Sequence, residues 1–266
     1  MDYTKSLYSL SLRACCRLLR ISRSVYNYQP DYDRDNPVVE ALSKLAEKYP
    51  RYGFPKLFVL LKREGHRWNH KRVHRVYCKM NLNMRRKFKK RLPARHPQPL
   101  SVPEAMNQSW LIDFMSDSLW DGRKFRTFNV VDDFNREALA IEVDLSLPSQ
   151  RVIRVLDRLV AWRGFPQQLR MDNEPEFISL TIADWAETHG VHLEYIEKGK
   201  PTQNSNVERF NGTYRTEVLN YYMFQNLTEV REITDQWLEQ YNEERSHESL
   251  GALTPREYAR ASYYTQ

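Results

Sequence analysis

Three acidic residues occupy positions where a carboxylate is either unusual or well placed for chemistry. Asp113 interrupts the alternating stretch 109–119, which is typical of a β-strand, and Asp is disfavoured inside strands. Asp172 directly follows the short stretch 168–171, and Glu208 falls in the first turns of an expected helix. Carboxylate oxygens suit Mg²⁺, and two such ions about 4 Å apart stabilise both the attacking and the leaving oxygen in phosphodiester cleavage. Asp113, Asp172 and Glu208 are therefore the candidate catalytic residues and metal ligands.

Simpler explanations apply to several acidic residues in this part of the chain. Taken alone, Asp172 is more readily explained as a turn or cap residue at the end of a strand. The pair Asp132 and Asp133 precedes Phe-Asn-Arg and is interpreted as turn chemistry. Asp117 lies on the first strand and is expected to be exposed.

The order of the expected elements allows the three carboxylates to converge. Strands are expected at 109–119, 124–131, 139–143, 168–171 and 191–196, and helices at 148–162, 178–188, 204–222, 227–243 and 254–262. The order β-β-β-α-β-α-β-α predicts an α/β fold with a mixed five-stranded sheet and helices on both faces. The first and fourth strands are then neighbours at the sheet centre, and the helix that begins near residue 204 crosses their ends.

The positive charge is concentrated in the first part of the chain. Residues 1–100 hold 24 Lys and Arg against 7 Asp and Glu, whereas residues 101–266 hold 17 against 27. The stretch 62–95 carries 14 basic residues against one acid and is interleaved with aromatic side chains. A solvated charge run is the alternative, but this density favours nucleic-acid binding.

Short helices carry much of this charge. Residues 10–26 are typical of a small helix-turn-helix with a break at Ser22. Helices are also expected at 38–49, at 57–64 and after the Asn69 cap, and the last of these turns basic side chains outward. The side chains predicted to contact DNA from this helix and from the basic linker after it are Lys71, Arg72, Arg75, Lys79, Arg85 and Arg86.

Two motifs in the acidic part of the chain are similar to the signature of bacterial insertion-sequence transposases. They are Asp172-Asn-x-Pro-Glu176-Phe, and Glu208 within Pro-Thr-Gln-Asn204-x-x-Val-Glu-Arg-Phe-Asn211. The match is to the OrfB type, in the group that uses a frameshifted OrfA–OrfB fusion. The core of this family looks like retroviral integrase and has the RNase H-like fold. The stretch 65–75 resembles the family's helical module, and Tyr-Asn, Arg, His and Thr-Pro between 241 and 255 resemble its C-terminal tail.

The resemblance implies a domain order and an activity. The expected domains are a helix-turn-helix-like segment at 1–30, a helical DNA-binding module at 31–83, a basic linker at 84–105, the integrase catalytic core at 106–223 and a helical tail at 224–266. The metal-binding D-D-E triad then falls on Asp113, Asp172 and Glu208. The implied reaction is cleavage of phosphodiester bonds at element ends, followed by transfer of the 3′-hydroxyl into target DNA. Two Mg²⁺ ions are expected as cofactors, with Mn²⁺ as a substitute.

The resemblance also implies partners and a location. Element-end DNA, target DNA, further copies of the same chain in a synaptic complex and an OrfA product or fusion are expected. The stretch of apolar residues needed to span a membrane, roughly 18, is absent from the sequence, and three cysteines favour no disulfide framework. The chain is therefore expected in the bacterial cytoplasm, associated with the nucleoid.

Two positions depart from the family pattern. Glu174 stands where the family usually has Gly, so we expect a strained turn and an added negative charge near the metal site. Ser246 stands where the tail usually has Pro, and its effect is expected to be minor.

Further DNA contacts are predicted around the third acid. Arg215 shares a helix face with Glu208 and is predicted to point at DNA phosphates, with an ion pair to Glu208 or Glu217 as the alternative. The other predicted contacts are Lys200, Gln203 and Arg209.

The ladder His66, His70, His74 and Cys78 has a spacing that suggests zinc. A break at Gly65 and at the Asn69 cap separates the first histidine from the helix, and a second cysteine is missing, whereas structural zinc sites have four ligands. These histidines are therefore interpreted as part of the DNA-facing surface.

Two other functions remain open from the sequence. A catalytically decayed transposase would keep DNA binding without joining DNA. An RNase H-like nuclease without joining activity would explain the triad but not the basic region.

Overall fold

The computed structural model describes residues 3, 9, 11–29, 33–84, 103–196 and 204–263. Two compact units are present: Met1–Pro50 with Leu61–Asn83, and Arg51–Leu60 with Met84–Gln266. Most of the expected basic linker, 85–102, lies outside the described residues. None of the described helices is long and apolar enough to cross a membrane.

The predicted short helices are present in the described residues up to 84. The helices are α2 (Leu12–Leu18), α3 (Arg23–Tyr26), α4 (Asn36–Lys48), α5 (Phe54–Arg63) and α6 (His70–Lys79), with the short 3₁₀ turn η1 (Asp33–Asp35) before α4. The predicted break at Ser22 is confirmed, because its side chain caps α3 by accepting from the Val25 amide. The predicted cap of α6 is also confirmed, since the Asn69 side chain accepts from the Lys71 amide at 2.8 Å.

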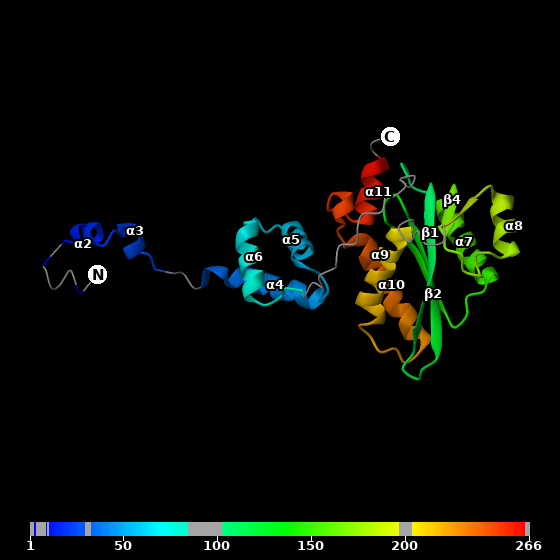
Figure 1. Cartoon of the computed structure of the whole chain (residues 1–266), viewed down its shortest axis with the longest axis horizontal. Helices are drawn as coiled ribbons and strands as arrows, with labels where there is room; N and C mark the ends of the chain where they lie inside the picture. The colour runs from blue at the N-terminus through cyan, green and yellow to red at the C-terminus, as the bar shows by residue number, and fades with distance from the viewer. Residues whose placement is uncertain are drawn as a thin grey trace, which may run out of the picture. The chain divides into compact units, whose positions relative to one another are not determined.

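A five-stranded sheet forms the centre of the larger unit (Figure 1). Its strands are β1 (Ser109–Ser118), β2 (Lys124–Asp132), β3 (Ala138–Asp144), β4 (Gln168–Met171) and β5 (His192–Tyr195). They lie in the order β3-β2-β1-β4-β5, with β1–β2 and β2–β3 antiparallel and β1–β4 and β4–β5 parallel. The predicted mixed sheet, with the first and fourth strands adjacent, is confirmed.

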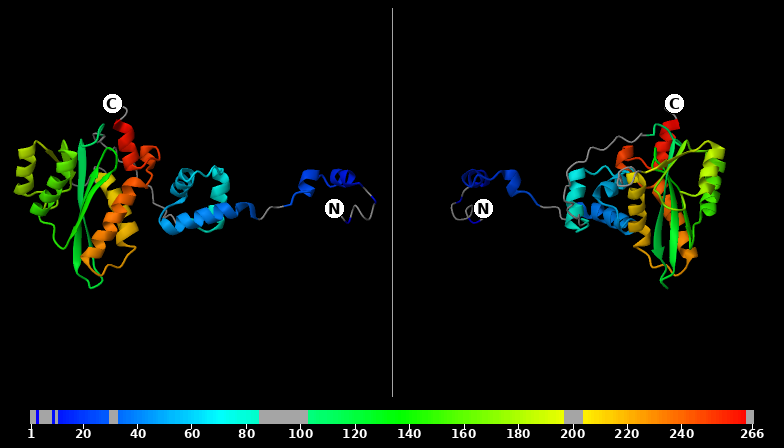
Figure 2. Two further views of the ribbon diagram at one scale, coloured as in Figure 1. Left: turned by 180° about the vertical axis from the view of Figure 1, so that it is seen from behind. Right: turned by 45° about the vertical axis from the view of Figure 1, so that its right-hand side comes forward.

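Helices cover both faces of this sheet (Figures 1 and 2). On one side lie α7 (Ser149–Arg163) and α8 (Leu180–His189), and on the other lie α9 (Ser205–Tyr214) and α10 (Leu227–Glu243). The tail ends in a 3₁₀ turn, η4 (Glu248–Leu250), and in α11 (Pro255–Tyr263). The expected helix 204–222 is in fact α9 followed by a π-helical segment, η3 (Arg215–Leu219).

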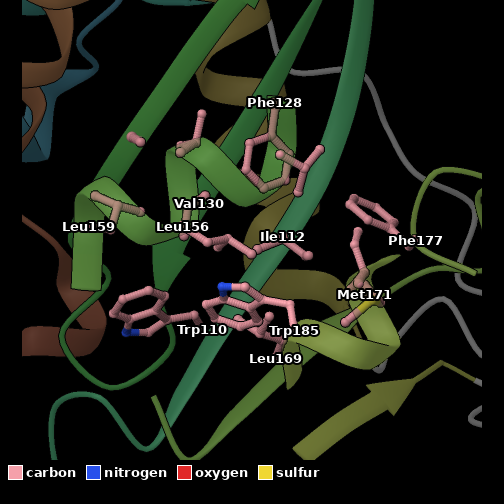
Figure 3. Close-up of a cluster of buried hydrophobic side chains, with 14 of the residues drawn as sticks. Trp110, Ile112, Phe128, Val130, Leu156, Leu159, Leu169, Met171, Phe177 and Trp185 are labelled. Atoms are coloured by element: carbon pink, nitrogen blue, oxygen red, sulfur yellow. The ribbon is translucent and has the colours of Figure 1, made fainter. Parts of the chain in front are cut away.

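The alternation along β1 divides its side chains between two hydrophobic cores. Trp110, Ile112 and Phe114 pack under α7 and α8 (Figure 3 shows the first two), whereas Leu111 and Met115 pack under α9 and α10. Successive residues of a strand point to opposite faces, so an odd-numbered residue of β1 faces α9. This rule decides where a carboxylate on β1 is presented.

Candidate active site

Strand register brings two of the predicted acids together. The parallel pairing of β1 with β4 sets Leu111 beside Arg170, and two residues further along each chain come Asp113 and Asp172. Asp113 has the same parity as Leu111 and so faces the side of the sheet covered by α9. One carboxylate oxygen from each of Asp113, Asp172 and Glu174 lies within 4.8 Å of the others. We call these three residues the carboxylate cluster.

Two hydrogen bonds hold the Asp113 carboxylate in place, and a third supports one of their donors. Its Oδ1 accepts from the Phe114 amide at 2.9 Å, and its Oδ2 accepts from Asn211 Nδ2 on α9 at 2.7 Å. Asn211 Oδ1 accepts in turn from Asn129 Nδ2 on β2 at 2.7 Å. Both asparagines are buried. This amide relay joins β2, α9 and β1 and fixes the orientation of the Asp113 carboxylate.

The electrostatic environment of the cluster favours a proton or a cation. Burial raises the pKa of Asp113 to about 7, and the negative charge of Asp172 adds to the effect. Glu174 and Glu208 raise this pKa further, while the Phe114 amide opposes it. Asp113 therefore feels three neighbouring carboxylates, and a bound cation would relieve that repulsion.

The predicted third acid, Glu208, lies beside the cluster rather than within it. It is exposed on α9, three residues before Asn211, whose side chain contacts Asp113. Its charge acts on Asp113. The acid that the structure places with Asp113 and Asp172 is Glu174.

Glu174 confirms one expectation and contradicts another. Its negative charge does lie in the site, as predicted. The expected backbone strain is wrong, because Glu174 is not among the residues with positive φ. The turn is instead closed by the Asp172 side chain, whose Oδ1 accepts from the Glu174 amide at 3.1 Å, and this geometry does not require glycine.

Arg126, which sequence reasoning missed, neutralises part of this charge. From β2 it binds Glu174 with Nη2 at 2.6 Å and also forms an ion pair with Glu176. Its guanidinium lies 4.3 Å from the centre of the Phe114 ring. Burial nevertheless leaves the pKa of Glu174 raised, with Asp172 adding to the rise and Arg126 opposing it. Arg126 is 48 residues from Glu174, and no local pattern in the sequence links the two.

The predicted DNA contacts on α6 fall into two groups. Lys71 and Lys79 are exposed. Arg72 and Arg75 bind Asp35 at 2.9 and 2.8 Å, and the hydrogen bond from Arg72 is the main cause of the lowered pKa of Asp35. The two arginines therefore help to attach α6 to η1.

The predicted DNA contacts near Glu208 also lie in different surroundings. Arg209 is exposed on α9. Arg215 lies 3.7 Å from Asp117 and donates to the Ser116 carbonyl at 3.1 Å, so the alternative ion pair with Glu208 or Glu217 is wrong. Asp117 is half-buried, not exposed as predicted, because it lies beside this arginine. The remaining predicted contacts, Arg85, Arg86, Lys200 and Gln203, lie outside the described residues.

The structure also shows the surroundings of His66 and Asp133. His66 precedes α6 and stacks on Trp68 at 4.1 Å between ring centres, which keeps it off the helix that carries the next two histidines of the ladder. Asp133 belongs to a turn, as interpreted, but it is buried and bound by Arg170 at 3.1 Å and by Asn206 at 2.8 Å. The sequence did not indicate that burial.

The donor set of the cluster fits a hard divalent cation. Its ligand atoms are carboxylate oxygens only, which Mg²⁺ prefers. Burial and repulsion from the neighbouring carboxylates raise the pKa of Asp113, so a bound cation would be favourable in this site. Asp113 lies on β1 and Asp172 directly follows β4, so the pairing of these two strands positions both ligands.

Comparison with known proteins agrees with this geometry. Models described as integrase core domains match residues 103–201 and 189–255, and a model described as an HTH-like domain matches residues 33–91. The chain is 40% identical over 260 residues to a 31.7 kDa protein of insertion element IS407 from Burkholderia multivorans, covering 97% of this chain and 94% of that protein. It is 26% identical over 265 residues to the putative transposase of insertion element IS150 from Escherichia coli, covering 93% of each chain.

Among solved structures, the HTLV-2 integrase catalytic core domain in complex with magnesium aligns with a TM-score of 0.46 at 16% identity, covering 59% of this chain and 98% of that one. The sheet order, the integrase core matches and the near full-length relative from an insertion element together identify the fold and the family. The chain belongs to the bacterial insertion-sequence transposases of the OrfB type, with an HTH-like domain and an integrase core of the RNase H-like fold.

Proposed function

We propose that this chain is a D-D-E polynucleotidyl transferase, which cleaves phosphodiester bonds at the ends of its insertion sequence and joins the 3′-hydroxyl to target DNA. The observation that carries the proposal is the register that sets Asp113 beside Asp172 on the sheet face covered by α9. Family membership supports the reaction type, and the basic helical region supports DNA as the substrate.

In this proposal Asp113, Asp172 and Glu208 hold two Mg²⁺ ions. When bound, the ions would activate the attacking oxygen as Lewis acids and would stabilise the leaving oxygen. Asn211 acts as a positioning residue that orients Asp113, and it sits one helical turn after Glu208. Motion of α9 would therefore shift the third acid and the support of the first acid together.

Glu174 is the observation that favours a second candidate function. A fourth carboxylate near the cations can occupy a coordination position that water or DNA needs, and this would leave a decayed protein that binds DNA without joining it. Arg126 argues for activity, since its bond to Glu174 holds part of that charge away from the cations. The nuclease alternative leaves the HTH-like domain without a role.

Strand transfer tests the proposal directly. Purified protein is incubated with Mg²⁺, DNA carrying the inverted repeats that flank the gene, and a supercoiled target, and joined products are measured. We expect joining by the wild type and a loss of at least 100-fold in Asp172→Asn. The matched control is Asp184→Asn, because Asp184 is an exposed aspartate on α8, on the opposite face of the sheet.

Three results distinguish the candidates. Joining that survives Asp172→Asn would mean that the site is assigned wrongly. Joining that is absent from the wild type and appears in Glu174→Gly would establish the decayed protein. Nicking of the repeats without any joined product would favour the nuclease.

We further propose how the rest of the chain serves this reaction. Lys71 and Lys79 of α6 contact DNA phosphates, in a DNA-binding module at 31–83 whose segment Arg51–Leu60 belongs to the same compact unit as the catalytic core. The active form is an oligomer that holds two element ends, and it works with an OrfA product or as an OrfA fusion in the bacterial cytoplasm. Binding of non-specific duplex DNA by the isolated chain should weaken steeply with salt, because phosphate contacts release counterions.

A further inference from the structure

A cavity of about 540 Å³ opens on a second face of α9, in the larger unit. Asn206, Arg209, Phe210 and Thr213 line it, which is the i, i+3, i+4, i+7 pattern of one helix face. Glu208 and Asn211, which serve the carboxylate cluster, lie on a different face of the same helix. The opposite wall is the tail segment 245–249, which belongs to the tail motif and to which the proposed reaction assigns no role.

The lining of this cavity is strongly basic. Lys56, Arg136, Arg209 and Arg245 contribute four cations, against one acid, Glu248. Arg245 is neutralised by Glu217 at 2.6 Å, and Arg136 by Asp133. Among the ion pairs between described residues, which include those of Arg136 and Arg245, none involves Lys56 or Arg209, and Lys56 Nζ lies 4.9 Å from the centre of the Tyr52 ring. At least one positive charge in the cavity therefore has no compensating protein anion.

One hydrogen-bonding atom in the cavity wall also lacks a partner. The Nε2 atom of His247 is buried and has no hydrogen-bond partner among the described residues. Ser246 and Ser249 add hydroxyl groups to the same wall. Buried polar atoms are normally paired, so the unpaired ring nitrogen of His247 offers a hydrogen-bonding position to a ligand of this cavity.

The titration of His247 supports this description of the cavity. Burial lowers the pKa of His247 to about 3, and the charges of Arg245, Lys56, Arg136 and Arg209 contribute. Burial also lowers the pKa of Lys56 to about 8, with Arg245 contributing. Neighbouring cations thus add to the effect of burial at both residues, although Glu217 opposes them at Lys56, and a bound anion would reduce their contribution.

We propose that this cavity binds a phosphate group, namely a backbone phosphodiester of the DNA on which the enzyme acts. Arg209 directly follows Glu208, so the cavity and the proposed third acid lie on adjacent faces of one helix, α9. Lys56 and Arg209 supply the charge, and His247 with the serine hydroxyls supplies hydrogen bonds. The source of the phosphate rests on the proposed function, whereas the cavity chemistry does not depend on catalysis.

The first test measures DNA affinity as a function of salt. The full chain is titrated against a fluorescent duplex in a series of NaCl concentrations, in EDTA so that no cleavage occurs. We expect Arg209→Gln and Lys56→Gln each to lower the slope of log K against log salt by about 0.9, the value for one lost phosphate contact. The matched control is Arg154→Gln, because Arg154 is exposed on α7 across the sheet, and its slope should equal that of the wild type. Unchanged slopes in both cavity variants would overturn the proposal.

A second test observes the cavity without substitution in it. The ring-proton resonances of His247, assigned with His247→Gln, are followed by NMR in the wild-type chain as a 16-bp duplex or inorganic phosphate is added. We expect the duplex to shift these resonances and to raise the histidine pKa, and Arg209→Gln to abolish the response. A response to inorganic phosphate alone would make the cavity a site for a small free anion and refute the DNA assignment.

The two proposals can fail separately. Asp172→Asn should still shift the His247 resonances on duplex binding, since the cavity does not include that residue. A wild type that shows the duplex response but joins no DNA would retain this inference and refute the proposed reaction.

Discussion

Replacing Asp113 with asparagine should stabilise the metal-free protein at alkaline pH. Burial and the neighbouring carboxylates raise the pKa of Asp113 from 3.8 to about 7. A raised carboxyl pKa means that the folded state holds the proton more tightly than the unfolded state does. The favourable contribution of Asp113 is therefore complete below about pH 4 and is lost as the pH rises through about 7.

The size of the effect follows from this pKa. One pKa unit corresponds to about 1.4 kcal/mol, so the full difference corresponds to about 4 kcal/mol above pH 7. Asp113 is partly exposed, and solvent screening reduces the expected gain in Asp113→Asn to roughly 2–4 kcal/mol at pH 8, with little difference from wild type near pH 4.

The amide relay can accommodate the asparagine. Its NH₂ group must donate where the Asp113 oxygen accepted, which requires the amides of Asn211 and Asn129 to rotate by half a turn. The Oδ1 atom of Asn129 is buried without a partner, so it can then accept from Asn211. The substitution therefore removes charge without leaving a new broken contact at Asp113.

Urea unfolding in EDTA, followed by tryptophan fluorescence between pH 4.5 and 8, measures the gain. Five of the six tryptophans lie in the larger unit, so the signal reports mainly on the integrase core. Asp184→Asn serves as the control and should follow the wild type at every pH. Mg²⁺ at 100 times its Kd should stabilise the wild type by about 2.7 kcal/mol, and this gain should be lost in Asp113→Asn. Equal stability of Asp113→Asn and wild type at pH 8 would refute the reasoning on Asp113.

Further predictions concern the support of the site and the DNA surface. Asn211→Ala removes the donor to Asp113 and should slow joining 10- to 100-fold in the strand-transfer assay, while DNA affinity stays unchanged. Glu174→Gly removes a carboxylate from the cluster and should raise the Mg²⁺ concentration needed for half-maximal stabilisation severalfold, as measured by thermal shift. Phe177 is fully buried, and its ring stacks on that of Phe114 with 4.7 Å between ring centres. Phe177→Ala should therefore lower the free energy of unfolding in urea by about 3–5 kcal/mol. Lys71→Gln should lower the salt slope of duplex binding by about 0.9 without changing stability, because that side chain is exposed.

Much of the fold could be predicted because it follows local rules. The alternation of apolar and polar residues over 109–119 predicted a strand. Pro148 and Gly164 predicted the limits of α7, and Gly164, which follows the helix, has a φ of +85°. The order of strands and helices then restricted the topology enough to make β1 and β4 neighbours. Asp113 and Asp172 were identified in this way. Asp113 lies on the central strand β1 and Asp172 follows the neighbouring strand β4, so the pairing of the two strands brings the carboxylates together.

The composition of the site was less predictable. Glu208 was expected from its place in the first turns of a helix and from the family motif, yet the structure sets Glu174 within the cluster and Glu208 beside it. The strain expected at Glu174 did not appear, because the side chain of Asp172 closes the turn instead. Helix interruptions were also missed, since the π-helical turn after α9 has no distinct sequence signal.

The sequence by itself therefore determined the elements, their order, the charge separation between the two parts of the chain and two of the acids. Only the tertiary structure decided that Arg126 binds Glu174 across 48 residues, that Asn211 reaches Asp113 across 98, and that the tail closes a basic cavity on α9. The physical reason is the range of the interactions. Periodicity, caps and turns are set by neighbours within a few residues, whereas hydrogen bonds and charges between distant segments depend on side-chain positions that exist only after the sheet and its helices have packed.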